Sequence, residues 1–183
     1  MSTRDTILAA ALQVLEEGGA SQFSTRTVCD LAKVTAPTLY HHFGNADGLL
    51  SAAMAEVFRQ FLASKQVAIQ STDPQTALRE GWDDYVRFAA ARPRLFAAVM
   101  GRLLDGAQID AAEQGLASLR RLVEGVAATG HLMLPPAAAA DVVLASANVA
   151  ALLHVSALTH DAPRPEPATI VAIREAAMRV LLA

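Results

Sequence analysis

Apolar side chains recur along most of the chain at steps of three and four residues, the spacing that places them on one face of an α-helix. In the first such segment, expected over residues 3–17, they include Ile7, Leu8 and Leu15. No stretch alternates apolar and polar residues with the period of two that marks half-buried strands. The sequence therefore predicts an all-α protein of about nine helices.

Glycines, prolines and capping residues divide this pattern into segments. Gly18-Gly19 should end the first helix, and Ser24 and Thr35 should cap the second and third helices. Asp73 should cap the helix that Pro74 opens. The helices expected after the first cover residues 25–32, 36–43, about 47–70, 74–91, 95–104, 108–128, 137–159 and from after Pro167 to 183.

A break at residues 44–47 separates three short helices from six further ones. We call residues 1–46 the head and residues 47–183 the body. The head should form a small core of its own, and its inward-facing residues are expected to be Phe23, Val28, Leu31, Ala32, Leu39 and Phe43.

Composition supports a helical protein with a sizeable core. Hydrophobic residues make up 53% of the 183 residues, and 39 of them are alanine, the strongest helix former. The lone Cys29 excludes an intramolecular disulfide and suits a reducing cytoplasm, where a small buried residue is the simpler interpretation. Residues 137–159 are apolar enough to raise the question of a membrane span. Polar residues interrupt them, so we expect a buried helix, no membrane partner and, without a signal peptide, a cytoplasmic protein.

The stretch from Ser24 to Phe43 carries the clearest functional signal. Two short helices joined by a tight turn, the second rich in small, hydroxyl and aromatic residues, suit insertion into the major groove of DNA. A plain three-helix packing unit would have the same spacing. Charge argues against a DNA reader, because residues 1–50 hold three basic and five acidic residues, whereas DNA-binding heads normally show a basic footprint.

The run from Phe23 to Leu50 resembles the DNA-binding head of the TetR (tetracycline-repressor) family of bacterial transcription regulators. The most specific element is Pro37-Thr38-Leu39-Tyr40-His41-His42-Phe43, followed by Leu49-Leu50. The resemblance implies that Arg26, Tyr40 and His42 lie near the DNA backbone, that Thr35 caps the recognition helix, and that Leu39 and Phe43 are core. The residues expected to contact DNA are Thr25, Arg26, Thr27, Lys33, Thr35, Ala36, Pro37, Thr38, Tyr40, His41 and His42.

Three positions depart from the pattern of the family. Lys33 replaces the usual glycine of the turn, Ala36 replaces a longer polar residue, and Ala46 stands where the family usually has a phosphate-gripping lysine. With fewer cations in contact with phosphates, the affinity for DNA should fall less steeply as the salt concentration rises. We therefore expect DNA binding of modest affinity.

The body should hold a small effector and form a homodimer, as the resemblance implies. Trp82, Tyr85 and Phe88 form an aromatic stripe on one side of the helix expected over residues 74–91. This stripe could line an apolar cleft or could be ordinary core, so a largely apolar effector is an expectation only. The candidate ligand-binding residues are Met54, Phe58, Trp82, Tyr85, Phe88, Phe96, Met100, Asn148 and His154, with Asp84 and Arg87 as further polar anchors. The candidate dimer interface consists of Val142, Ala145, Val149, Leu152, Leu153, Ile170, Ile173, Ala177 and Val180.

Catalytic and metal chemistry find no support in the sequence. His154 and His160 lie six residues apart on different helix faces, and no nucleophile elbow or phosphate loop is present. We expect no enzyme, cofactor or metal. The sequence favours a ligand-responsive regulator, more often a repressor in this family, that binds a near-palindromic double-stranded operator. The alternative is a helical homodimer that binds a small molecule or a protein with little or no DNA binding.

Overall fold

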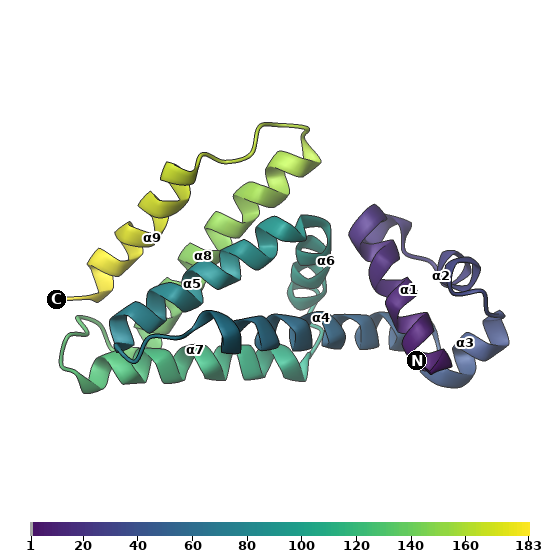
Figure 1. Ribbon diagram of the computed structural model, residues 1–183, viewed down its shortest axis with the longest axis horizontal. Coiled ribbons are helices and arrows are strands. Elements are labelled where there is room, and N and C mark those ends of the chain that lie inside the picture. Colours follow the sequence, from purple (N-terminus) through teal and green to yellow (C-terminus); the bar gives the residue numbers. More distant parts are fainter. Residues whose placement is uncertain (1) are drawn as a thin grey trace. The chain divides into compact units, whose positions relative to one another are not determined.

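The computed structural model describes residues 2–183, and within this range the only regular elements are helices (Figure 1). The all-α prediction is therefore confirmed. The α-helices are α1 (Thr3–Gly18), α2 (Thr25–Ala32), α3 (Ala36–Phe43), α4 (Ala46–Ala68), α5 (Pro74–Ala91), α6 (Pro93–Leu104), α7 (Asp110–Ala128), α8 (Pro136–Thr159) and α9 (Pro167–Leu181). A short 3-10 turn, η1 (Ala20–Gln22), lies between α1 and α2.

The predicted helix boundaries are correct to within about two residues, and the differences have local causes. Helix α6 begins at Pro93 rather than at residue 95, because proline fits the first helical position, where an amide hydrogen is not needed. Helix α9 ends at Leu181 rather than at residue 183. There Leu182 has an extended backbone and pairs with Leu132 in an isolated antiparallel bridge.

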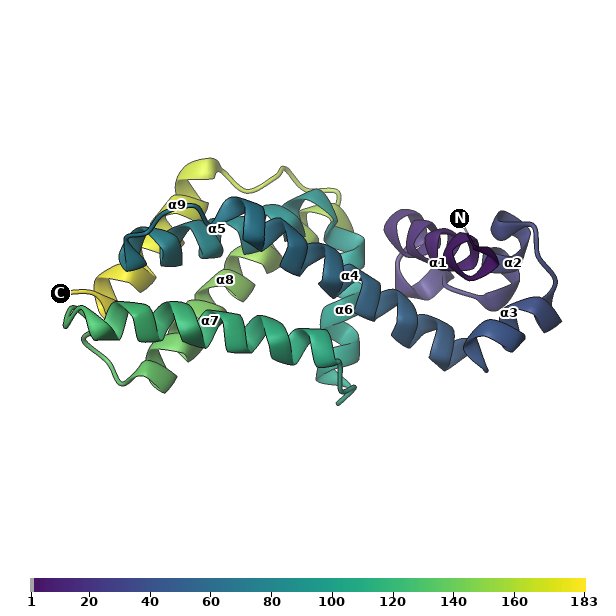
Figure 2. The ribbon, with the colours of Figure 1, turned by 60° about the horizontal axis from the view of Figure 1, so that its bottom comes forward.

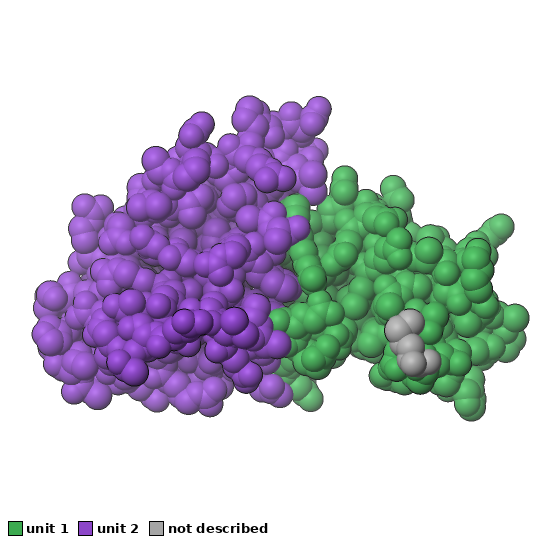
Figure 3. Space-filling view, viewed as in Figure 1, with its two compact units in different colours: residues 1–60, 92–111 green, residues 61–91, 112–183 purple. Residues whose placement is uncertain are grey.

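The chain divides into two compact units (Figure 3). Unit 1 contains the residues up to Gln60 together with Arg92–Ala111, and unit 2 contains Phe61–Ala91 and Ala112–Ala183. Helix α6, which the sequence pattern groups with the body, thus belongs to the same compact unit as the head. The functional boundary at residues 46 and 47 stays a prediction.

In unit 1, α1 packs against α2, α3 and α6 around side chains that are almost completely inaccessible. The core includes Ile7, Val28 and Leu39, which have no exposed surface. The prediction that Leu31 points inward is wrong, because 41% of it is exposed. Val28, Cys29 and Ala32 form the buried side of α2, and Leu31 lies about a quarter turn outside that side.

Cys29 is buried, as the sequence predicts. Desolvation, with a smaller contribution from neighbouring Asp30, raises the pKa of its thiol. A thiol that is buried and protonated is a poor nucleophile, so Cys29 is a packing residue.

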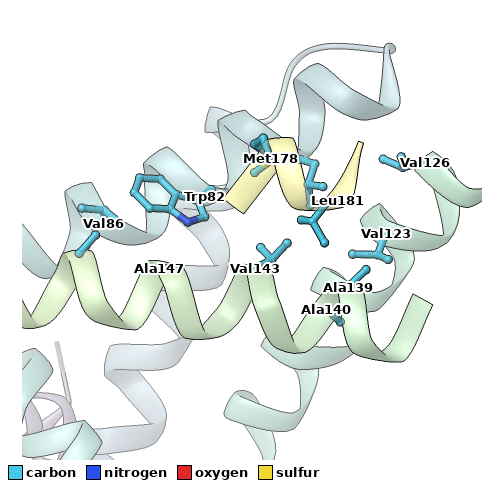
Figure 4. Close-up of a cluster of buried hydrophobic side chains, with 12 residues drawn as sticks. Trp82, Val86, Val123, Val126, Ala139, Ala140, Val143, Ala147, Met178 and Leu181 are labelled. Atoms are coloured by element: carbon cyan, nitrogen blue, oxygen red, sulfur yellow. The ribbon is translucent and has the colours of Figure 1, made fainter. Parts of the chain in front are cut away.

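In unit 2, α5 packs against α8, and α8 packs against α9 (Figures 1 and 2). Small side chains on the buried side of α8, among them Ala140, Ala147 and Ala150, let these helices approach closely. Figure 4 shows Trp82 of α5 lying against α8. Its indole N–H donates to Ser146 Oγ at 3.0 Å, so the one polar atom of this ring is satisfied inside the core.

Candidate nucleic-acid interface

Helix α2 begins at a side-chain cap. Ser24 has an extended backbone, and the Thr27 amide donates to Ser24 Oγ at 3.1 Å. The Ser24 and Thr27 hydroxyls also lie 2.7 Å apart. The predicted N-cap is confirmed, and it fixes the first turn of α2, where Thr25, Arg26 and Thr27 are located.

The turn between α2 and α3 is made by a residue in a left-handed conformation. Lys33 has φ 55° and ψ 42°, and its amide bonds back to the Cys29 carbonyl. The Val34 amide donates to the same carbonyl at 3.1 Å. A side chain in this region costs about 1–2 kcal/mol, a cost that glycine at this position would avoid. The Lys33 side chain is exposed.

The start of α3 leaves its first amides without a side-chain cap. Thr35 occupies the N-cap position, but its hydroxyl contacts Thr38 Oγ1 at 3.0 Å rather than a backbone amide. The sequence-based expectation that the Thr35 hydroxyl caps α3 is therefore wrong in its detail. Pro37 has no amide hydrogen, and the amides of Ala36 and Thr38 precede the first intrahelical donor, Leu39. Such amides can bind a phosphate.

Helix α3 buries one side and exposes the other. Leu39 is fully buried, whereas 42% of Tyr40 is exposed and its hydroxyl lies 3.5 Å from Thr25 Oγ1. This contact brings the last turn of α3 to the start of α2. Ala36, Pro37 and His41 are exposed as well. The outer surface of α2 and α3 therefore carries hydroxyl, aromatic and imidazole groups side by side, with few cations.

Phe43 at the end of α3 is only half-buried, although the sequence predicts a core residue. The Arg4 guanidinium lies over its ring, 5.1 Å from the ring centre. The His41 and His42 rings are 5.3 Å apart, edge to face. The Arg4 side chain of α1 thus packs over Phe43 at the end of α3.

Two of the five acidic groups of residues 1–50 are paired within unit 1. Arg102 of α6 donates to Asp47 at 2.7 Å, and Arg92, the N-cap of α6, lies 3.4 Å from Glu16 of α1. Arg92 also donates to Gln60 at 2.5 Å. Both ion pairs join residues more than fifty positions apart, so the local sequence pattern does not predict them. They reduce the acidic character of the head that the local count of charges suggests.

The candidate ligand-binding residues fall into both units. Met54 and Phe96 are buried in unit 1, and Phe58 and Met100 are half-buried there. In unit 2, the Tyr85 hydroxyl donates to Asn148 Oδ1 at 2.5 Å, and burial raises the pKa of Tyr85. Phe88 and His154 are half-buried in the same unit. Trp82 and Tyr85 therefore act as polar-anchored core residues between α5 and α8.

A cavity of about 470 Å³ lies between α4 and α7, in unit 2. None of the predicted ligand residues lines it. Its lining consists of Leu62, Lys65, Gln66, Ile69, Gln114, Ala117, Ser118 and Arg121.

The predicted dimer residues form a partly uncovered apolar surface on α8 and α9. About half of Val149, Leu152 and Val180 is exposed, and Ala145 is exposed, whereas Ala177 is buried within the unit. The half-buried members are Val142, Leu153, Ile170 and Ile173. By length and composition, α8 is also the one helix of residues 2–183 that could cross a membrane, with 28% of its most apolar window buried. In the same residues no group of three potential metal ligands occurs.

The fold and the head together define a class: an all-α protein in which a helix-turn-helix unit precedes a helical body. Residues 7–53 match the bacterial regulatory proteins of the tetR family. The head and the start of α4 are therefore similar to the corresponding part of this family.

Individual relatives agree with this assignment. Over 90 residues the chain is 32% identical to the HTH-type transcriptional repressor NicS of Pseudomonas putida, covering 46% of this chain and 42% of NicS. It is 27% identical to the HTH-type transcriptional regulator BetI of Burkholderia thailandensis over 82% of this chain and 77% of BetI. The crystal structure of a TetR-family transcriptional regulator from Pectobacterium atrosepticum, 26% identical, superposes with a TM-score of 0.76, covering 99% and 94% of the two chains.

Proposed function

We propose that the protein is a cytoplasmic, homodimeric transcriptional regulator that binds DNA through α2 and α3. The exposed face of α3 is the observation that carries the proposal. It combines uncapped amides at the helix start with the half-buried Thr38 and the exposed Tyr40. Arg26 in the first turn of α2 and Lys33 directly after this helix are exposed as well. Hydroxyls, free amides and cations are the groups that bind phosphate oxygens.

The proposal includes dimerisation through α8 and α9. A soluble helix that leaves Val149 and Leu152 half-exposed needs a second surface to cover them. In a twofold dimer, the same surface of a second copy supplies that cover, and the two heads then meet successive major grooves. Matching half-sites explain why a near-palindromic operator is expected.

A small-molecule effector would regulate binding by shifting the population of two dimer conformations. The effector would bind the body and favour the conformation with the lower operator affinity, which makes the protein a repressor that is released by its ligand. A coupling free energy of this kind is typically about 1–3 kcal/mol. A ligand that raises the melting temperature should then also weaken DNA binding.

Titration of the protein against labelled duplexes from its own upstream region tests the proposal. Binding should be saturable and sensitive to salt, and Arg26→Ala and Tyr40→Phe should each weaken it. Arg120→Ala is the matched control, because Arg120 is an exposed arginine on α7, outside the head. Binding that is indifferent to Arg26 and Tyr40 on every native duplex would rule the proposal out.

The second candidate is a helical homodimer that binds a small molecule or a protein but no DNA. The charge of the head favours it: Arg4 covers Phe43, and Asp30 is an exposed acid on α2. The same titration separates the two functions. This candidate predicts a stable dimer that binds no duplex even at low salt.

A further inference from the structure

The cavity between α4 and α7 has a charge pattern that is unlike an apolar effector cleft. Its two walls have the same residue spacing: residues 62, 65 and 66 of α4 with Ile69 directly after that helix, and residues 114, 117, 118 and 121 of α7. Two of these eight positions are cations, Lys65 and Arg121, and none is a carboxylate. A cavity of about 470 Å³ is within the usual size range of small-molecule sites.

Lys65 is held in place with its charge incompletely matched. Its ammonium group donates to the Gly81 carbonyl at 2.9 Å and lies 5.0 Å from the centre of the Phe61 ring. An ammonium group has three donors, so this bond leaves two of them. The nearby carboxylate of Asp84 already accepts hydrogen bonds from Ser64 and Arg87.

Lys65 is also desolvated, which lowers its pKa, and Asp84 only partly offsets this effect. An anion placed against the ammonium group would compensate for the water that it has lost. Binding of a negatively charged ligand next to Lys65 should therefore be favourable.

Arg121 faces the same cavity from α7. Within residues 2–183 no hydrogen bond or ion pair engages its guanidinium group. Its neighbours Gln114 and Ser118 supply further polar groups, and Leu62 and Ile69 supply an apolar wall. An exposed arginine without an acidic partner, at the rim of a cavity that already holds a lysine, is complementary to an anion.

We propose that the cavity between α4 and α7 binds a small organic acid, with its carboxylate facing Lys65 and Arg121 and its apolar part against Leu62 and Ile69. This inference rests on the proposed function, because it names the chemical class of the effector. It also changes the effector expected from the sequence, from a largely apolar molecule to an anionic one.

Calorimetric titration of the full-length dimer with benzoate and hexanoate, and with the uncharged benzamide and hexanamide, tests the proposal. The acids should bind saturably below about 10 mM and the amides at least about tenfold more weakly, since losing a charge-assisted hydrogen bond costs about this factor. Arg121→Gln should weaken binding of the acids about tenfold. Arg120→Gln, which removes the same charge one residue away and outside the cavity lining, should leave it unchanged.

Ala117→Phe provides a second variant that keeps both cations. Its ring should fill the cavity and abolish binding of the acids, while the circular dichroism spectrum stays that of a folded helical protein. The proposal is overturned if neither acid binds, if acids and amides bind equally, or if Arg121→Gln and Arg120→Gln behave alike. Duplex binding by the same samples distinguishes the two failures. If the protein binds duplex DNA but neither acid, only this inference is wrong. If it binds the acids but no duplex DNA, the proposed regulator function is wrong instead.

Discussion

Lys33 offers a single position at which backbone strain and DNA contact can be separated. Its left-handed conformation, φ 55° and ψ 42°, costs a residue with a side chain about 1–2 kcal/mol. Glycine avoids this cost but loses about 0.5–1 kcal/mol more conformational entropy on folding. Lys33→Gly should therefore stabilise unit 1 by roughly 0.5–1 kcal/mol. Lys33→Ala keeps the strained backbone and should give no such gain.

Both variants remove the same cation from the turn between α2 and α3. If Lys33 contacts a phosphate, the slope of log affinity against log salt should become shallower by about 0.9 for each subunit, and equally in both variants. Compared with the unsubstituted protein, Lys33→Gly would then be more stable and would bind DNA more weakly at low salt.

Hydrogen exchange of the Val34 amide, which donates across the turn, reports the stability of unit 1, and fluorescence anisotropy in a salt series reports the DNA contact. Equal stability of the glycine and alanine variants would refute the strain argument. Unchanged salt slopes in both would refute the phosphate contact.

Substitutions at three further positions test other parts of the account. Ser24→Ala should destabilise α2 by about 1 kcal/mol because the Thr27 amide loses its acceptor, and Ser24→Thr should restore most of this in urea unfolding. Tyr85→Phe should cost about 1–3 kcal/mol in the same assay, because Asn148 Oδ1 loses its donor. Burial raises the pKa of Tyr85 in the folded protein, so the unfolded chain loses the proton first and stability should fall above about pH 10, less steeply in Tyr85→Phe. Ala46→Lys should steepen the salt slope of duplex binding by about 0.9 for each subunit, and an unchanged slope would show that position 46 does not reach a phosphate.

The sequence predicted the starts of α2 and α5 well because they depend on local chemistry. Ser24 accepts a hydrogen bond from an amide three residues ahead, and Asp73 does the same for Thr76 at the start of α5. Such caps act within one turn and leave a readable sequence pattern. The cap of α3 differed because Thr35 and Thr38 can bond each other, a choice that spacing alone does not determine.

The contacts of α6 could not be predicted in the same way. Arg92 and Arg102 reach Glu16 and Asp47, two acids of residues 1–50 that lie far away along the chain. Helix periodicity shows which face of α6 is apolar but not which helix it meets. The charge of the head, judged from residues 1–50 alone, therefore appeared more acidic than the folded unit is.

The ligand site could not be located from the aromatic stripe of α5. Trp82 and Tyr85 have the spacing of a cavity wall, but that spacing is equally that of a core. In the fold, their polar atoms bond Ser146 and Asn148 of α8. The residues that line the cavity on α4 and α7 include lysine, arginine and glutamine, which on a helix resemble any solvated surface. The two groups of lining residues, 62 to 69 and 114 to 121, have the same spacing in the sequence, but only the fold shows that they face each other.

A footprint of the dimer on its own upstream DNA tests the central claim most directly. If α3 inserts into the major groove, hydroxyl-radical and methylation protection should reveal two protected grooves about 34 Å apart, one for each subunit. Arg26→Ala should lose both protected regions at a protein concentration at which Arg120→Ala retains them. A folded dimer that protects no site, or protection that survives in Arg26→Ala, would contradict the account.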